Sequence, residues 1–208
     1  MEYSVIGQRS LYSVGITFIF FSIIAILKFA YVPIYEILGL FYVVTLVMAG
    51  VFLILASFGY FWGAKRYSSS PSYLSAILII SVGIGYILLA TSLESMDILL
   101  MGIALTIIKP ALFFYSFTTM YFFFEIEHGK MGGIGSLLIL FFSSSHHFFA
   151  FSPEFYRTLP GAIFTSIAAI GYMMQGFSIG IASRHEVSET TTQETEETRI
   201  RMPITRPF

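Results

Sequence analysis

Six long apolar runs, almost free of charge, constrain this chain more than any other feature. About 20 mostly apolar residues are enough for a helix to cross the roughly 30 Å hydrocarbon core of a bilayer. The runs are continuously apolar instead of alternating, which argues against transmembrane β-strands. The sequence therefore predicts an all-α, polytopic membrane protein. Its expected spans lie at about residues 11–32, 37–62, 73–93, 98–124, 131–152 and 158–183.

The amount and the placement of charge agree with a bilayer environment. Charged residues make up 11% of the 208 residues, against about 25% in an average soluble domain. Of the 11 basic and 12 acidic side chains, nine lie beyond residue 183, which leaves too few for a water-exposed surface. The net charge of −1 gives no basic patch for nucleic acid. The absence of cysteine excludes disulfides, thiolate metal sites and thiol nucleophiles.

The links between the runs are short, so we expect consecutive helices to be antiparallel and residues 1–183 to form one compact bundle. Small residues four apart, such as Gly59 and Gly63, are typical of close helix packing in lipid. Residues 184–208 are rich in Thr and Glu, and we expect them to be a disordered polar tail. The tail and the helix faces are the candidate surfaces for a protein partner or for a second copy of the chain.

Lysine and arginine bias predicts the orientation in the cell membrane. One side of the predicted bundle collects five basic residues, and the other side has only Lys28 and Arg157. The five are Arg9, Lys65, Arg66, Lys130 and Arg184. Both termini are therefore predicted to be cytoplasmic.

Lys109 is the one basic residue near the middle of a predicted span, and it is followed by Pro110. An ionisable side chain within a membrane is a functional candidate, because a charge there is costly. Two interpretations remain open. Either Lys109 is satisfied by local carbonyls or reaches the membrane surface, or it forms a charged or proton-exchanging site that lines a cavity.

The stretch FFSSSHHFFAF places Ser143, Ser144, His146 and His147 between phenylalanines. A fifth helix that ended at Phe142 would be only ~18 Å long, too short to cross ~30 Å of hydrocarbon. We therefore expect the cluster to lie within the outer part of the bilayer, with Ser143 at a depth close to that of the Lys109 ammonium group. A polar pocket between the fourth and fifth helices is one interpretation. Proton sensing by the histidines and simple polar packing at the interface are the others.

A metal site at the outer end is a weaker hypothesis. Imidazoles and carboxylates suit zinc, iron or manganese, but no HExxH or similar spacing occurs on one helix. The candidate ligands are His146, His147, Glu94, Asp97 and Glu154. Haem is disfavoured, because adjacent histidines on a helix point about 100° apart and the remaining ones, His128 and His185, fall at the opposite end. No cofactor is predicted.

These features favour a binding or structural membrane protein, that is, a subunit, scaffold or sensor acting through its helix faces and its tail. A transporter or channel for a small solute or protons is the alternative, and it would use Lys109 and the Ser143–His147 cluster. A membrane enzyme with a metal at its outer face is the third. We expect no enzymatic activity, because no catalytic motif is present.

Overall fold

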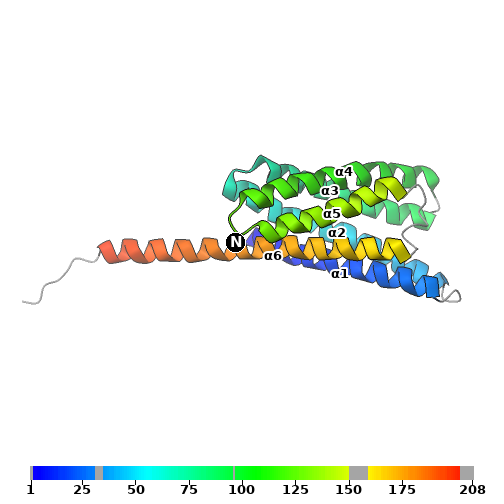
Figure 1. The fold of residues 1–208 in the computed structure, drawn as a ribbon, viewed down its shortest axis with the longest axis horizontal. Helices are drawn as coiled ribbons and strands as arrows, with labels where there is room; N and C mark the ends of the chain where they lie inside the picture. Colours follow the sequence, from blue (N-terminus) through cyan, green and yellow to red (C-terminus); the bar gives the residue numbers. More distant parts are fainter. Residues whose placement is uncertain (1, 31–34, 96, 150–158, 202–208) are drawn as a thin grey trace, which may run out of the picture.

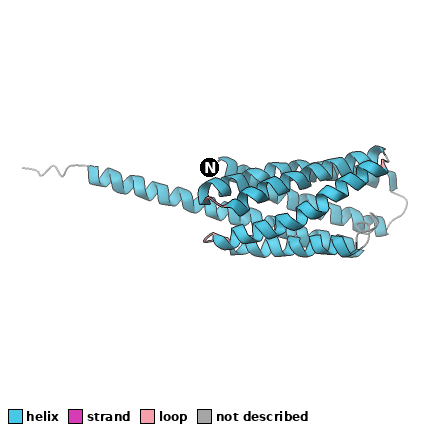
Figure 2. Ribbon diagram, turned by 90° about the horizontal axis from the view of Figure 1, so that it is seen from above, coloured by secondary structure: helices cyan, strands magenta, loops and turns pink. Residues whose placement is uncertain are grey.

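The computed structural model describes residues 2–30, 35–95, 97–149 and 159–201, with side chains for 2–27, 40–95, 97–143 and 160–185. Over these residues the chain is helical with short links and contains no strand (Figures 1 and 2). The helices are α1 (Glu2–Ala30), α2 (Tyr35–Tyr67), α3 (Ser70–Ser95), α4 (Ile98–Glu125), α5 (Lys130–Phe149) and α6 (Leu159–Arg201). Within the described residues, five helices are long and apolar enough to cross a membrane. For α5 the apolar stretch with described side chains, Lys130–Ser143, is shorter.

The six helices form a closed ring in chain order. Each helix packs against the one before it and the one after it, and α6 packs against α1 to complete the ring. The beginning of α1 and the projecting part of α6 lie at the same end of the bundle (Figure 1). This arrangement gives all six helices access to one shared interior.

The link between α2 and α3 shows how local chemistry sets this arrangement. Ser68 adopts φ 50°, and the Ser69 N–H donates to the Ala64 carbonyl at 3.2 Å. This is the hydrogen bond of a Schellman motif, which ends a helix through one left-handed residue. The chain therefore reverses within two residues, and α3 begins at Ser70 beside the end of α2.

Glycines allow three neighbouring pairs of helices to approach closely. The facing pairs are Gly7 and Gly59 (α1–α2), Gly50 and Gly83 (α2–α3), and Gly135 and Gly171 (α5–α6). A Cβ atom on Gly135 would lie 2.5 Å from the Gly171 carbonyl oxygen, and one on Gly171 would lie 2.6 Å from the Gly135 carbonyl oxygen. Such contacts need backbone without side chains, as in other membrane helix pairs. The predicted packing role of Gly59 and Gly63 is confirmed, since Gly63 faces Phe122 and Ser72.

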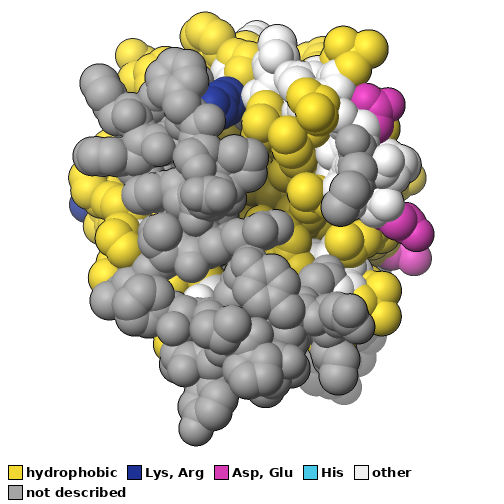
Figure 3. Space-filling model, turned by 90° about the vertical axis from the view of Figure 1, so that its right-hand side faces the viewer, with side chains coloured by type: hydrophobic (Ala, Val, Ile, Leu, Met, Phe, Trp, Pro, Cys, Tyr) yellow, Lys and Arg dark blue, Asp and Glu magenta, His cyan; other side chains and the backbone are white. Residues whose placement is uncertain are grey.

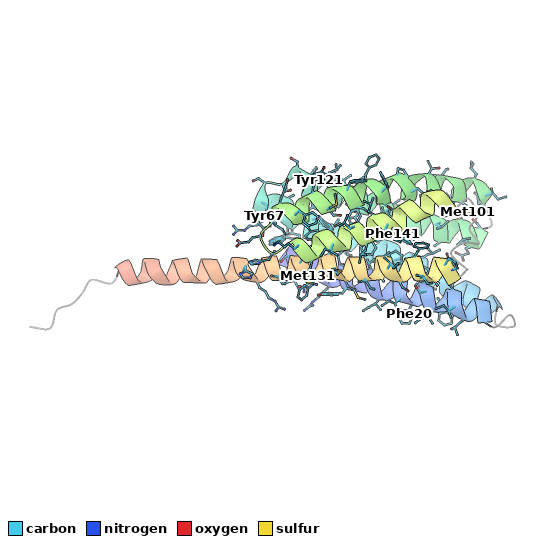
Figure 4. The ribbon with its side chains drawn as sticks, viewed as in Figure 1. Phe20, Tyr67, Met101, Tyr121, Met131 and Phe141 are labelled. Carbon is cyan, nitrogen blue, oxygen red and sulfur yellow. The ribbon has the colours of Figure 1, made fainter. Side chains whose placement is uncertain are left out.

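The distribution of side chains fits a hydrocarbon environment. Large apolar side chains are exposed around the outside, and Figure 4 shows Phe20 and Tyr121 on the outer flanks of the bundle. Meanwhile hydroxyl and amide groups such as those of Tyr60, Ser136 and Gln175 are fully buried. A water-soluble protein of this size would rarely expose so much contiguous apolar surface.

The structure differs from the sequence prediction after Ser183. In place of the predicted disorder, α6 continues as one helix to Arg201 and projects beyond the bundle (Figure 1). The rest of the predicted tail, 202–208, lies outside the described residues. No glycine or proline interrupts residues 181–202, and Glu, Gln and Arg, which are good helix formers, recur along them. The polarity of this segment keeps it out of the bundle, but it does not stop the helix.

Candidate functional site

The interior of the ring contains a cavity of about 40 Å³ to which every helix contributes. Its lining comprises Phe18, Phe21, Tyr42, Leu46, Tyr86, Leu89, Leu105, Ile108, Lys109, Phe142 and Thr165. The volume is room for a few water molecules, since one needs ~10–15 Å³ by this measure. The cavity lies in the half of the bundle away from the α6 extension. Figure 3 views the molecule from that end, with apolar side chains around its middle and acidic side chains at the rim.

The wall of this cavity is mainly aromatic and aliphatic, with a few polar groups. Lys109 is the only charged side chain among the described residues that line it, and it is partly buried. Tyr86 is buried and Tyr42 is partly buried, so two phenols stand in the same wall. The Thr165 hydroxyl donates to the Gly161 carbonyl at 2.7 Å within α6. The site therefore combines an apolar surface with one cation.

The helical repeat explains why Lys109 faces inward. Leu105, Ile108 and Lys109 fall on one face of α4 and all line the cavity, whereas Thr106 and Pro110 are exposed on the outside. Proline lacks an N–H and breaks one backbone hydrogen bond of a helix. Here that position is on the outer surface, away from the cavity. Lys109 thus lies on a cavity wall, and both interpretations of its role stay predictions.

Of the serine and histidine cluster, only the Ser143 side chain is described, and it does not line this cavity. Phe142 lines the cavity together with Lys109. The neighbouring Ser143 is buried, and its hydroxyl donates to the Leu140 carbonyl at 2.9 Å within its own helix. Ser144, His146 and His147 belong to α5, but their side chains lie outside the described residues. The predicted polar pocket that unites Lys109 with this cluster therefore stays a prediction.

Two of the predicted metal ligands, Asp97 and Glu94, have described side chains, and the structure does not bring them together with other ligands. Asp97 caps α4, because its Oδ1 accepts from the Leu99 and Leu100 N–H groups at 2.9 and 3.1 Å. Glu94 is exposed near the end of α3. Glu154, like the side chains of His146 and His147, lies outside the described residues. Over the part of the chain with described side chains, no three His, Asp or Glu residues group as metal ligands. A metal site at this end stays a prediction.

Below the cavity, a buried hydrogen-bond network crosses the ring around Gln175. Its Oε1 lies 2.6 Å from the Tyr115 hydroxyl and 2.9 Å from the Tyr60 hydroxyl, and the two hydroxyls are 2.7 Å apart. Its Nε2 donates to the Ser136 and Thr119 hydroxyls at 2.9 and 3.3 Å. The network therefore joins α2, α4, α5 and α6.

The protons of this network can be counted. Two tyrosine hydroxyls supply two protons to three oxygen–oxygen contacts, so two of these contacts are hydrogen bonds at any one time. The Thr119 and Ser136 hydroxyls donate to carbonyls of their own helices, the former at 2.8 Å and the latter at 2.9 Å, which leaves their oxygens to accept from Gln175. Both protons of the amide and its oxygen are thus used.

Tyr172 adjoins the network without joining it. Its ring is stacked on that of Tyr115 and also contacts Phe18, which lines the cavity. Its hydroxyl is buried and has no hydrogen-bond partner in the structure as described. Tyr60, Tyr115 and Tyr172 are all fully buried. Together they fill the interior between the cavity and the end from which α6 projects.

Sequence reasoning did not identify this network. Gln175 is the only amide side chain within the six predicted spans, so one signal was present. Its tyrosine partners could not be chosen from the 13 tyrosines without knowing which helices meet.

No protein-family model, no curated protein and no solved structure matches this chain.

Proposed function

We propose that this protein is an integral membrane protein of six spans that acts as a binding subunit or sensor. Its ligand is a small amphiphilic anion, such as a short-chain or medium-chain carboxylate, held in the cavity of the ring. The observation that carries the proposal is the lining of that cavity, where α1 to α5 supply aromatic and aliphatic side chains, α6 supplies Thr165, and Lys109 supplies one positive charge.

The length and direction of the helices support six spans. The 20 residues of α5 correspond to ~30 Å of helix, close to the thickness of the hydrocarbon core. The start of α1 and the end of α6 lie at one end of the bundle, as an even number of crossings requires (Figure 1). Together with the bias in lysine and arginine, this supports termini in the cytoplasm and a cavity in the outer half of the bilayer.

The chemistry of the wall favours an amphiphilic anion. Ligand sites are typically apolar, with a few polar groups that fix the orientation of the ligand. Phe18, Phe21 and Leu46 offer contact to a hydrocarbon chain, and Lys109 offers a cation in a region of low dielectric, where an opposite charge is bound strongly. A neutral ligand would not gain this electrostatic binding energy from Lys109. A carboxylate head group with an apolar tail matches both parts of the wall.

The filled interior favours binding over conduction. The layer of Tyr60, Tyr115, Tyr172 and Gln175 is fully buried and occupies the ring below the cavity. Transport of a solute or protons, the alternative, would require this layer to separate and its hydrogen bonds to break. Binding leaves this layer intact: the carboxylate fits beside Lys109 in the present volume, and the side chains that line the cavity must move apart to admit the chain of octanoate.

The test compares octanoate with octanol, which share a chain and differ in charge. Calorimetric titration of the purified protein in mild detergent measures both affinities for the wild type, Lys109→Met and Lys109→Arg. Lys130→Met is the control, because Lys130 is an exposed lysine at the other end of the bundle. We expect Lys109→Met to weaken octanoate about tenfold, or ~1.4 kcal/mol, and to leave octanol unchanged. The charge-preserving arginine variant should retain most of the affinity.

Equal octanoate affinity in the wild type and in Lys109→Met would refute the proposed ligand class. Flux of octanoate or protons through reconstituted vesicles, abolished by the same substitution, would favour the transporter instead. In that case the layer of Tyr60, Tyr115, Tyr172 and Gln175 would have to open and close as a gate.

A further inference from the structure

A second cavity, of about 260 Å³, lies at the end of the bundle from which α6 projects. Three segments that are distant in the sequence line it. They are the end of α2 with Arg66 and Tyr67, the α4–α5 link with Ile126, Glu127 and His128, and α6 with Ala182 and His185. Ile126 and Ala182 are buried and form an apolar floor, while the charged residues and the histidines are exposed. Figure 4 shows Tyr67 at this end, opposite Met101.

The two histidines are held face to face. Their ring centroids are 4.2 Å apart and the ring planes are within 18° of parallel, although the residues belong to the α4–α5 link and to α6. The lone pairs and N–H bonds of an imidazole lie in the plane of its ring. In a stacked pair, the lone pairs and N–H bonds of the two rings lie in parallel planes, so they do not point at a common atom. The pair is therefore a poor chelate for a metal ion, but it presents two parallel donors to a ligand with several oxygens.

We propose that this cavity binds a phosphate group, with Arg66 and the imidazoles of His128 and His185 as its donors. The guanidinium group forms paired hydrogen bonds with phosphate oxygens and keeps its charge at all physiological pH values. The neighbouring imidazoles supply two further N–H donors. The cavity is much larger than a single ion requires, so it accommodates the rest of a phosphomonoester. This proposal concerns a site separate from the octanoate cavity and does not depend on it.

The charges around the cavity favour an anion. Within the wall Arg66 and Glu127 balance in charge, and Tyr67 is neutral. On the adjoining segments the exposed basic side chains of Lys65, Lys130 and Arg184 outnumber the exposed Glu125. The potential at this end of the bundle is therefore positive, which attracts phosphate.

The experiment measures binding of inorganic phosphate to the whole chain in detergent at pH 7, with chloride as the reference anion. Arg66→Gln is expected to weaken phosphate binding at least tenfold. Lys65→Gln is the matched control, because it removes the adjacent exposed charge, which does not line the cavity, and it should change the affinity by less than twofold. His128→Phe and His185→Phe keep an aromatic ring but remove the N–H donors, and each should weaken phosphate binding severalfold. Lys109→Met should have no effect here.

A competition arm identifies the source of the phosphate group. Displacement of bound phosphate by short-chain phosphatidic acid, but not by phosphatidylcholine, assigns the site to a lipid head group. Displacement by glycerol phosphate alone assigns it to a soluble phosphomonoester, and both results support the site. Wild-type affinity in Arg66→Gln, or no binding of phosphate above that of chloride, overturns the proposal.

Discussion

Replacing Gln175 by methionine isolates the contribution of the buried network to the stability of the bundle. Methionine is close to glutamine in length and in helix propensity, so the substitution chiefly removes the amide. The amide donates two hydrogen bonds, to Ser136 and Thr119, and accepts one or two from Tyr60 and Tyr115. The variant therefore loses three or four hydrogen bonds between helices.

The magnitude follows from measured values for membrane helices. Hydrogen bonds between such helices average ~0.6 kcal/mol each, so three or four amount to ~2 kcal/mol. One tyrosine proton is also left without its acceptor. We expect Gln175→Met to lower the free energy of unfolding by about 2 kcal/mol on this basis.

Tyr172→Phe is the matched control for this experiment. It removes a buried hydroxyl from the same helix, but that hydroxyl has no hydrogen-bond partner in the structure as described. Because an unsatisfied hydroxyl is costly to bury, its removal should leave the stability unchanged or raise it by up to ~1 kcal/mol. The assay is reversible unfolding by dodecyl sulfate in mixed micelles, followed through Trp62, the only tryptophan, which is buried in α2. A loss below ~0.5 kcal/mol for Gln175→Met, or an equal loss for Tyr172→Phe, would refute this reasoning.

Two further substitutions test the packing of α5 against α6 in the same assay. Gly135→Ala places a Cβ 2.5 Å from the Gly171 carbonyl oxygen and should cost about 1–3 kcal/mol. Gly102→Ala is the control, because a Cβ there would have nothing within 4 Å, and it should be neutral or stabilising by up to ~1 kcal/mol. A loss of stability in Gly102→Ala equal to that in Gly135→Ala would contradict the close approach of α5 and α6. Ser178→Ala removes the acceptor for the Gly132 N–H, 2.7 Å away in the first turn of α5, and should cost about 1 kcal/mol. Its control is Ser183→Ala, because the Ser183 hydroxyl donates to a carbonyl of α6 itself. Similar losses of stability in both variants would contradict the capping role of Ser178.

The helices could be predicted because their main determinant is local. An uninterrupted apolar run identifies a helix in lipid regardless of its neighbours, and the link around Ser68–Ser70 was visible as a polar interruption. The start of α1 was missed, since Glu2 and Arg9 shorten the apolar run while the helix itself begins at Glu2. As a result Gly7, the partner of Gly59, lay outside the predicted span. Hydropathy likewise marked the end of the apolar part of α6, but not the end of the helix.

The site could be predicted only where one residue was unusual on its own. Lys109 is conspicuous as a cation within a span, and the structure places it on the wall of the cavity. Its neighbours there, such as Tyr86 and Thr165, are ordinary residues that acquire a role through the rotation and pairing of helices. The same holds for His128 and His185, which are 57 positions apart in the sequence and stack in the fold. Relations between distant segments are what the sequence alone does not reveal.

The central claim, a ring of six helices that all cross the bilayer, is tested most directly by labelling single cysteines in intact cells. The chain has no cysteine, so Ser70→Cys, Ser95→Cys and Ser188→Cys each create one target for a membrane-impermeant thiol reagent. Ser70 and Ser95 are exposed at the two ends of α3, and Ser188 lies in α6 beyond its apolar part. We predict that only Ser95→Cys reacts before permeabilisation and that all three react afterwards. Labelling of Ser188→Cys together with Ser95→Cys in intact cells would mean five crossings and would contradict the six-span ring.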